Sequence, residues 1–291
     1  MASAELRIIN RRIKSVKSTK KITRAMELIA SSRIVKAQQR MVSSSSYIEA
    51  LAEIVQDLVN LGSIVEDSSQ KDSNKVAMVV ITSDRGLAGA YNSNILKLAE
   101  QKHQELLSSN KEVDLYTVGK KASGYFSYRN IEPASSYEGV TDEPKFENAL
   151  DVTKLIIESY SNGYLSEVHI LYTKYVSALT QNAIVKQLLP LKKKDSSEGE
   201  VEEKTGGYSF EPSAEEVLEE LIPKYINATL FGALLNSSTS EHASRMRAMK
   251  AATENAEDLV KVLTRQSNQA RQAEITTEIS EIVGGAEALS D

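Results

Sequence analysis

The spacing of apolar residues predicts a long amphipathic helix at each end of the chain. Near the start, Ile9, Ile13 and Val16 are four and three residues apart, the spacing at which side chains share one helix face. The same kind of spacing relates Ile22, Met26 and Ile29, then Ile48, Leu51, Val55 and Leu58, and near the end Met246, Met249, Thr253, Ala256, Val260, Leu263, Ser267 and Ala270. Alternating steps of three and four residues are typical of a coiled-coil seam.

The absence of helix breakers extends this prediction. Residues 1–61 and 233–283 contain neither Gly nor Pro. We therefore predict one helix over residues 1–62 and another over 213–291. The second begins at Ser213, which is predicted to form a capping box with Glu216. Helices of this length can bury their apolar stripes only against each other or against a partner. We therefore predict that the two helices form an antiparallel coiled coil.

Three features suggest irregularities in the second long helix. Pro223 and Gly232 lie inside the helical pattern and predict a kink or a short break near one of them. Gly284 and Gly285 predict that the helix frays at its end.

The middle of the chain, residues 75–190, has a different pattern. Strands are predicted at 76–82, 113–118 and 168–175, with a further strand possible at 179–189, and helices at 92–107, 119–126 and 144–160. Strands that alternate with helices favour a small, largely parallel, Rossmann-like α/β sheet. Residues 191–212 are polar and predict a loop between this head and the second long helix.

Composition narrows the possible chemistry. The 291 residues are 41% hydrophobic and 5% aromatic, with no Trp, which suits helices packed through aliphatic side chains. Cys is absent, which excludes disulfides, thiol nucleophiles, thiolate metal sites and thiol switching. No apolar run is long enough to cross a bilayer and no signal-peptide pattern opens the chain, so we expect a soluble protein that reaches a membrane only through a complex.

Charge is unevenly distributed although the whole chain carries only −5. Residues 1–40 contain eleven Lys and Arg against two Glu, Glu5 and Glu27. Few of these cations have an acidic residue four positions away, so the strip is predicted to be unpaired and to meet an anionic partner. A solvated helix face is the alternative.

A loop at residues 83–92 is the one candidate for phosphate binding. It contains Gly86 and Gly89 between a predicted strand and helix, but it lacks the spacing of a dinucleotide or P-loop motif. The favoured interpretation is a tight turn in which Asp84 and Arg85 pair locally or with a partner. His103, His169 and His242 lie in separate elements, so we predict no catalytic site, no cofactor and no metal.

Four segments together carry a specific resemblance. They are KITRAMELIASSR at 21–33, SDRGLAGAYN at 83–92, RMRAMKAATENA at 245–256 and ARQAEITTEI at 270–279. In order and separation they resemble the gamma subunit of F-type rotary ATP synthases, over nearly the whole chain. The resemblance implies a central rotor stalk without chemistry of its own. One copy would thread a hexamer of alpha and beta subunits and meet the epsilon subunit and the c-subunit ring.

The resemblance also implies positions of contact. An acidic loop of the beta subunit would face the basic residues Lys20, Lys21 and Arg24, and Met26 matches the family's coupling position. The matching contact positions on the second long helix are Arg245, Arg271, Gln272, Thr276 and Glu278, and those of the ring-facing foot are Tyr208, Phe210 and Glu211. A peripheral location on the cytoplasmic face of the cell membrane follows, with coupling to proton or sodium movement.

Two other classes of function stay open at this point. A nucleotide-binding enzyme or sensor would use the 83–92 loop, and binding of ATP or NAD by the isolated chain would reveal it. The second class is a basic coiled coil that binds nucleic acid. The first 46 residues contain no aromatic side chain for base stacking, which argues against it.

Overall fold

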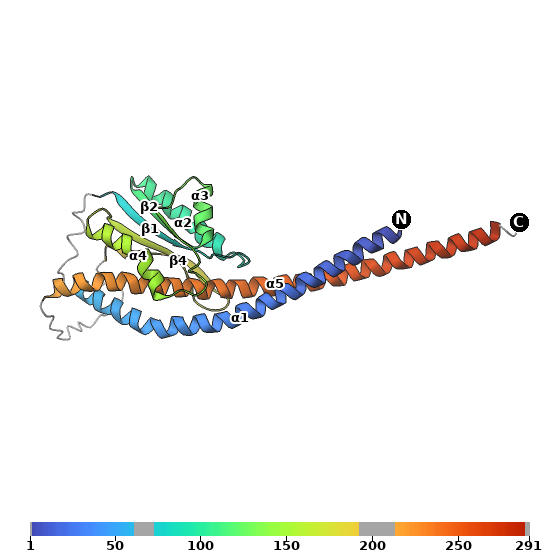
Figure 1. Cartoon of the computed structure of the whole chain (residues 1–291), viewed down its shortest axis with the longest axis horizontal. Helices are drawn as coiled ribbons and strands as arrows, with labels where there is room; N and C mark the ends of the chain where they lie inside the picture. The colour runs from blue at the N-terminus through green and yellow to red at the C-terminus, as the bar shows by residue number, and fades with distance from the viewer. Residues whose placement is uncertain (1, 61–72, 192–212, 289–291) are drawn as a thin grey trace. The chain divides into compact units, whose positions relative to one another are not determined.

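The computed structural model describes residues 2–60, 73–191 and 213–288. The chain divides into two compact units: residues 1–31 with 245–291, here the coiled-coil unit, and residues 32–244, here the head unit. Two long helices, α1 (Ala2–Asn60) and α5 (Ala214–Ala288), contribute to both units (Figure 1). Their lengths agree with the absence of Gly and Pro from most of both tracts.

The head unit contains a five-stranded sheet in the order β3-β2-β1-β4-β5. Its strands are β1 (Lys75–Ile81), β2 (Glu112–Val118), β3 (Ser135–Tyr137), β4 (Glu167–Tyr175) and β5 (Gln181–Leu189), and its helices are α2 (Tyr91–Ser108), α3 (Lys120–Tyr128) and α4 (Phe146–Ser161). Only β5 is antiparallel to its neighbour, so the prediction of a largely parallel α/β sheet is confirmed. The short edge strand β3 was not predicted.

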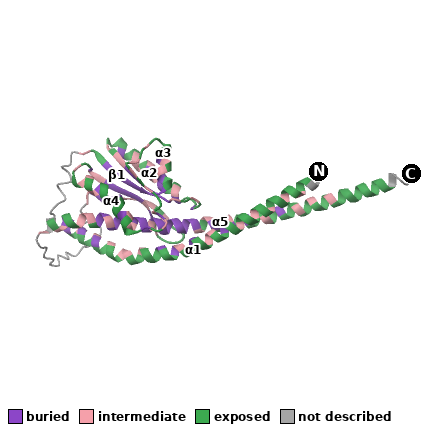
Figure 2. Cartoon of the chain, in the orientation of Figure 1, coloured by how far each residue is buried: buried purple, intermediate pink, exposed green. Residues whose placement is uncertain are grey.

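The two faces of the sheet bury different helices. Alternate residues of β1 point to opposite sides: Ala77, Val79 and Ile81 join a cluster with α4, α1 and α5, whereas Val76, Met78 and Val80 join a cluster with α2 and α3. Every residue of β1 after Lys75 is buried (Figure 2). Burial on both faces explains why this strand is a continuous apolar run rather than an alternating one.

The part of α5 in the head unit contains no break. The helix continues through both Pro223 and Gly232, so of the predicted kink or short break the structure excludes the break. Packing explains why position 232 is a glycine, because a Cβ atom there would lie 3.0 Å from Cδ1 of Ile48 on α1. Gly232 therefore allows α1 and α5 to approach closely. The helix also continues past Gly284 and Gly285 to Ala288, so fraying at these glycines is not observed.

The start of α5 agrees with the sequence. The backbone N–H of Glu216 donates to Oγ of Ser213 at 3.2 Å, one of the two hydrogen bonds of the predicted capping box.

In the coiled-coil unit α1 and α5 run antiparallel along a thin seam. The Oγ1 atoms of Thr23 and Thr253 form a hydrogen bond of 2.8 Å, and Oγ of Ser267 lies 3.1 Å from Oδ1 of Asn10. On α5 the seam contains Met249, Thr253, Ala256 and Leu263, all buried as predicted. On α1 it contains Thr23 and Ala30, whereas Ile22 and Ile29 are 59% and 56% exposed. The predicted phase was therefore wrong by one residue over this part of α1.

No helix within the described ranges has both the length and the apolar character to cross a membrane.

Candidate functional site: a charged cluster and the exposed faces of the coiled coil

The loop after β1 is organised by Asp84. Its carboxylate accepts hydrogen bonds from the backbone N–H groups of Lys120 (3.1 Å), Gly139 (2.9 Å) and Thr141 (3.3 Å) and from the Thr141 hydroxyl (2.9 Å). Burial by itself would raise the pKa of Asp84, but these hydrogen bonds together lower it below its ordinary value. Asp84 thus ties the loop to α3 and to the segment between β3 and α4.

This loop occupies the position where many doubly wound sheets bind a ligand. The strand order reverses between β1 and β4, and such folds bind ligands at the carboxyl ends of the strands beside this point. Here the polar groups bond to one another: the N–H and Oγ of Ser83 contact Oδ1 of Asn92 at 3.0 Å, and Oγ of Ser83 contacts the Arg85 carbonyl. Local pairing, the favoured interpretation, is what the loop shows.

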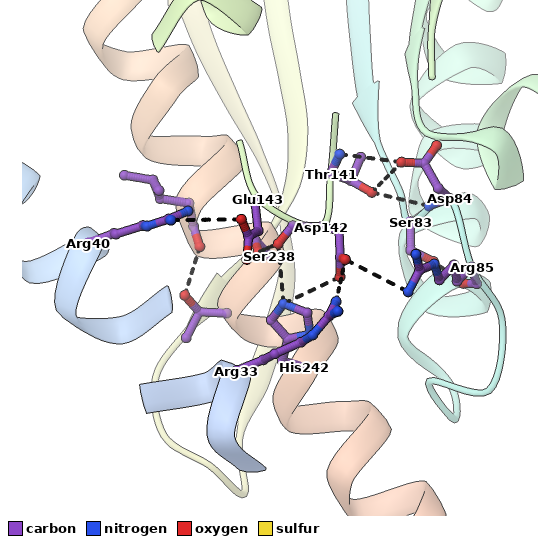
Figure 3. A network of polar contacts seen from close by, with 12 residues as sticks. Arg33, Arg40, Ser83, Asp84, Arg85, Thr141, Asp142, Glu143, Ser238 and His242 are labelled. Carbon is purple, nitrogen blue, oxygen red and sulfur yellow. Dashed lines mark hydrogen bonds and ion pairs between the residues drawn. The ribbon is translucent and has the colours of Figure 1, made fainter. Parts of the chain in front are cut away.

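Next to this loop a second carboxylate joins three segments of the head unit. We call it the Asp142 cluster, and its members are Arg33, Arg40, Arg85, Asp142, Glu143, Ser238 and His242 (Figure 3). Asp142 forms an ion pair with Arg33 of α1 and lies 3.8 Å from the Arg85 guanidinium. Its backbone carbonyl accepts from the Ser238 hydroxyl of α5 at 3.0 Å.

His242 completes the cluster from the same face of α5. It is 2% exposed, and its Nε2 lies 3.3 Å from the Asp142 carbonyl. Burial tends to raise the pKa of Asp142, but Arg33, His242 and Arg85 lower it below its ordinary value. The cluster therefore holds an ionised carboxylate that links α1, α5 and the 83–92 loop.

The Asp142 cluster has no room for a substrate. The adjoining cavity, lined by Arg33, Lys36, Arg40 and His242 among others, measures about 20 Å³. That is enough for roughly one water molecule. No group of three or more His, Asp or Glu side chains among the described residues is arranged to hold a metal ion.

The expected contact residues in the coiled-coil unit differ in exposure. Lys21, Arg24, Arg271, Gln272, Thr276 and Glu278 are exposed, Lys20 and Met26 are half-buried, and Arg245 is buried. The predicted lack of acidic partners is wrong for Lys20 and Arg24, as it is for Arg33 and Arg40 of the Asp142 cluster. Lys20 pairs with Glu257 of α5 at 3.1 Å, and Arg24 contacts Glu27 at 2.9 Å. The expected foot residues Tyr208, Phe210 and Glu211 lie outside the described residues.

Sequence reasoning found only part of the charged cluster. The local pairing of Asp84 and Arg85 was expected, but the involvement of Arg33, Asp142 and His242 was not, because these residues come from distant segments. The available signal was the pair Asp142-Glu143 directly before Pro144, a charged turn between two predicted elements.

Comparison with known proteins assigns the chain to a family. A family model described as ATP synthase matches residues 5–289. The ATP synthase gamma chain of Parafrankia sp. (strain EAN1pec) is 45% identical over 99% of this chain and 99% of its own length. That of Streptomyces coelicolor is 46% identical over 99% and 97%. The chain belongs to the gamma chains of ATP synthase.

Solved structures agree with this family at the level of the fold. A chain of the mitochondrial ATP synthase of Euglena gracilis has a TM-score of 0.71 at 20% identity and covers 99% of this gamma chain and 95% of its own length. A chain of the central stalk and c-ring of the Tetrahymena thermophila enzyme has a TM-score of 0.58 at 24% identity and covers 79% and 99%. The function is that of a gamma chain of an ATP synthase.

Proposed function

We propose that this gamma chain is a non-catalytic rotor that couples turning of a c-subunit ring to the nucleotide affinities of an alpha/beta hexamer. One copy would serve each hexamer, and the epsilon subunit would bind beside it. Ion movement would occur in the ring and ATP chemistry in the hexamer, at the cytoplasmic face of the cell membrane. The observation that carries the proposal is the thin coiled coil of α1 and α5, whose polar and apolar side chains are mostly left exposed.

The physical basis of coupling is asymmetry. A rod made of two different helices presents different side chains in different directions, so it cannot contact three equivalent subunits in the same way. Each contact would bias the conformational equilibrium of one subunit, and nucleotide affinity would change with it. Rotation would pass each bias to the next subunit. No nucleotide need bind to the gamma chain itself.

The exposed faces of the coiled-coil unit suit this role. Lys21 and Arg24 present cationic groups to solvent on α1, and an acidic loop of the beta subunit is their proposed partner. On α5, Arg271, Gln272, Thr276 and Glu278 supply polar contacts. Four apolar side chains on the same stretch, Ile275, Ile279, Ile282 and Val283, are 47–70% exposed and form a stripe with helical spacing. We propose that these four side chains contact the lining of the hexamer's central cavity.

Two expected contacts have a more restricted part in the proposal. Arg245 is 8% exposed, so only a small part of its surface would be available for contact with the hexamer. Met26 lies half-buried, so it would transmit force through its packing as well as through direct contact. Tyr208, Phe210 and Glu211 are proposed to meet the ring on the strength of the family resemblance alone.

The assembly test is co-purification of tagged gamma chain with the alpha and beta subunits. We expect one copy per hexamer, and the isolated chain to bind neither ATP nor NAD detectably. A gamma chain that remains outside the complex, or that binds nucleotide alone, would overturn the proposal.

The coupling test reverses the charge of the basic strip. In vesicles with the reconstituted complex, Lys20→Glu, Lys21→Glu and Arg24→Glu together should reduce ATP-driven ion pumping per ATP hydrolysed by several-fold. The matched control changes three exposed lysines of the head unit, Lys97, Lys121 and Lys154, to Glu.

A second control is needed because Lys20 pairs within the chain. Lys20→Glu alone would place two carboxylates together, and adding Glu257→Lys restores the internal pair while leaving the surface rearranged. If the triple variant pumps normally, the proposed role of the strip is wrong. If Glu257→Lys fully restores pumping to Lys20→Glu, the role of Lys20 is internal rather than toward the hexamer.

A further inference from the structure

The head unit contains a half-open cavity of about 130 Å³ that the coupling function does not use. Three elements form it: α1 contributes Met41 to Glu49, α5 contributes Thr229 to Asn236, and the sheet contributes Tyr172 and Lys186. A water molecule in the liquid takes up about 30 Å³, so the cavity has room for several waters or one small ion. It is well below the 300 Å³ or so at which pockets accept drug-sized ligands or nucleotides.

Lys186 gives this cavity its charge. Its ammonium is 5.9 Å from the ring centroid of Tyr225, which is itself buried. No carboxylate within the described ranges forms an ion pair with it. Burial, followed by repulsion from Lys174, lowers the pKa of Lys186 below its ordinary value. Lys186 is half-buried, and a partly desolvated cation without a counter-ion is destabilising, so an anion in the cavity would offset this cost.

The other polar groups at the cavity are mainly hydrogen-bond donors or groups already satisfied. Thr229 and Tyr172 carry hydroxyls, whereas the Ser45 hydroxyl already donates to the Val42 carbonyl at 2.8 Å. Asn236 is engaged: its side chain donates to the Gly232 carbonyl at 2.8 Å and accepts from the Tyr175 N–H at 3.2 Å. The one carboxylate in the lining is Glu49, which is exposed and makes no ion pair with Lys186.

We propose that this cavity is a binding site for a small oxyanion, a phosphate or a short carboxylate, held by the Lys186 ammonium and the hydroxyls of Thr229 and Tyr172. Met41, Ile48, Ala233 and Leu235 supply apolar walls that limit competition from water. The ligand is limited to a few heavy atoms by the volume. Binding requires only the head unit, so the inference does not depend on the proposed coupling function.

The test uses the isolated full chain with inorganic phosphate and, separately, acetate. Calorimetry should detect saturable binding of at least one of the two, and the lysine Nζ signal of Lys186 in NMR should shift as the anion is added. Lys186→Met should weaken binding about tenfold or more, because a charge-assisted contact is lost. Lys174→Met is the matched control, since it removes a nearby but exposed charge, and binding should stay within about twofold.

The Glu49→Gln variant tests whether the anion that Lys186 attracts is an added ion or the carboxylate of Glu49 itself. If the ligand is external, the variant should bind the anion as well as or better than the parent chain, because the nearest negative charge is gone. If neither the parent nor Glu49→Gln binds phosphate or acetate, the proposal is wrong. A Lys186 signal that shifts with pH but not with either anion overturns it equally, and this measurement on the parent chain does not depend on how Lys186→Met folds.

Discussion

The same helix is packed in two different ways in the two units. In the head unit, α5 is covered on nearly every side: Leu230, Leu234 and even the consecutive polar residues Ser237 to Ser240 are buried. In the coiled-coil unit the buried residues among those described on α5 are only Arg245, Met249, Thr253, Ala256 and Leu263 (Figure 2). The head therefore carries its own core, whereas the coiled coil leaves most of its surface exposed. Stability and coupling are assigned to different parts of one continuous element.

The largest effect is expected from shortening a core side chain of the head. Leu230→Ala should lower the free energy of unfolding by about 3–4 kcal/mol, because Leu230 is fully buried, whereas Leu263→Ala in the thinner seam should cost about 2 kcal/mol. Urea unfolding of the isolated chain, followed by circular dichroism, measures both. Equal losses would mean that the seam packs as tightly as the head core.

The next effect concerns the Asp142 cluster. Asp142→Asn leaves Arg33 and Arg85 without their carboxylate and should cost roughly 2 kcal/mol at pH 7. Urea unfolding would again measure the loss. Arg85→Gln is the matched control, since it removes a more distant and more exposed charge, and it should cost less than about 1 kcal/mol.

The pH dependence sharpens this prediction. The pKa of Asp142 is lowered in the folded chain, so its stabilising contribution is present above the unfolded-state pKa of about 3.9 and is lost as the pH falls through the folded-state pKa. The stability difference between the parent chain and Asp142→Asn should therefore shrink below about pH 4. A difference that stays constant from pH 7 down to pH 3 would show that the carboxylate charge is not responsible.

A smaller effect on stability, but a clear one on register, is expected in the coiled coil. Thr23 and Thr253 bond to each other inside a seam of small residues, where apolar packing alone defines the alignment weakly. Changing both to Val replaces both partners of the hydrogen bond by apolar groups of similar shape, so it should alter the free energy of unfolding by less than about 1 kcal/mol while allowing α1 to slide against α5.

The chain has no Cys, so engineered disulfides report this sliding directly. Asn10→Cys with Ser267→Cys should cross-link in the parent chain, and Asn10→Cys with Glu274→Cys, one heptad away, should not. With both Thr residues changed to Val, the second pair should begin to cross-link. An unchanged pattern would mean that the hydroxyl pair does not set the register.

The smallest effect is expected from the Lys20–Glu257 pair. Both side chains are partly exposed, at 37% and 51%, so Lys20→Met should change the free energy of unfolding by about 0.5 kcal/mol or less. A loss above about 1.5 kcal/mol in urea unfolding would show that this ion pair contributes to the fold, in contrast with its solvent-exposed position.

Local pattern was sufficient for most of the fold. Apolar spacing located the long helices, and short apolar runs located β1, β2, β4 and β5. β3 was missed because Ser135 to Tyr137 form only three mostly polar residues at a sheet edge. Ile22 and Ile29 were assigned to the seam because they are the most apolar residues nearby, yet Thr23 and Ala30 allow the helices to approach more closely.

The candidate site was less predictable because it depends on residues that are distant in sequence. Arg33 and Asp142 are separated by more than a hundred positions, and no local pattern relates them. Gly232 shows the same limit: its sequence context suggests a weak point in a helix, whereas its function depends on Ile48 of another helix.

The composition of the two clusters in the head unit also sets an order for biosynthesis. The cluster under α2 and α3 uses only residues from Val76 to Val185, so it can assemble while the ribosome is still making the rest. The larger cluster needs Leu51 to Val59 of α1 together with Leu218 to Leu234 of α5. The apolar side of α1 is therefore synthesised about 160 codons before the α5 residues that complete its cluster.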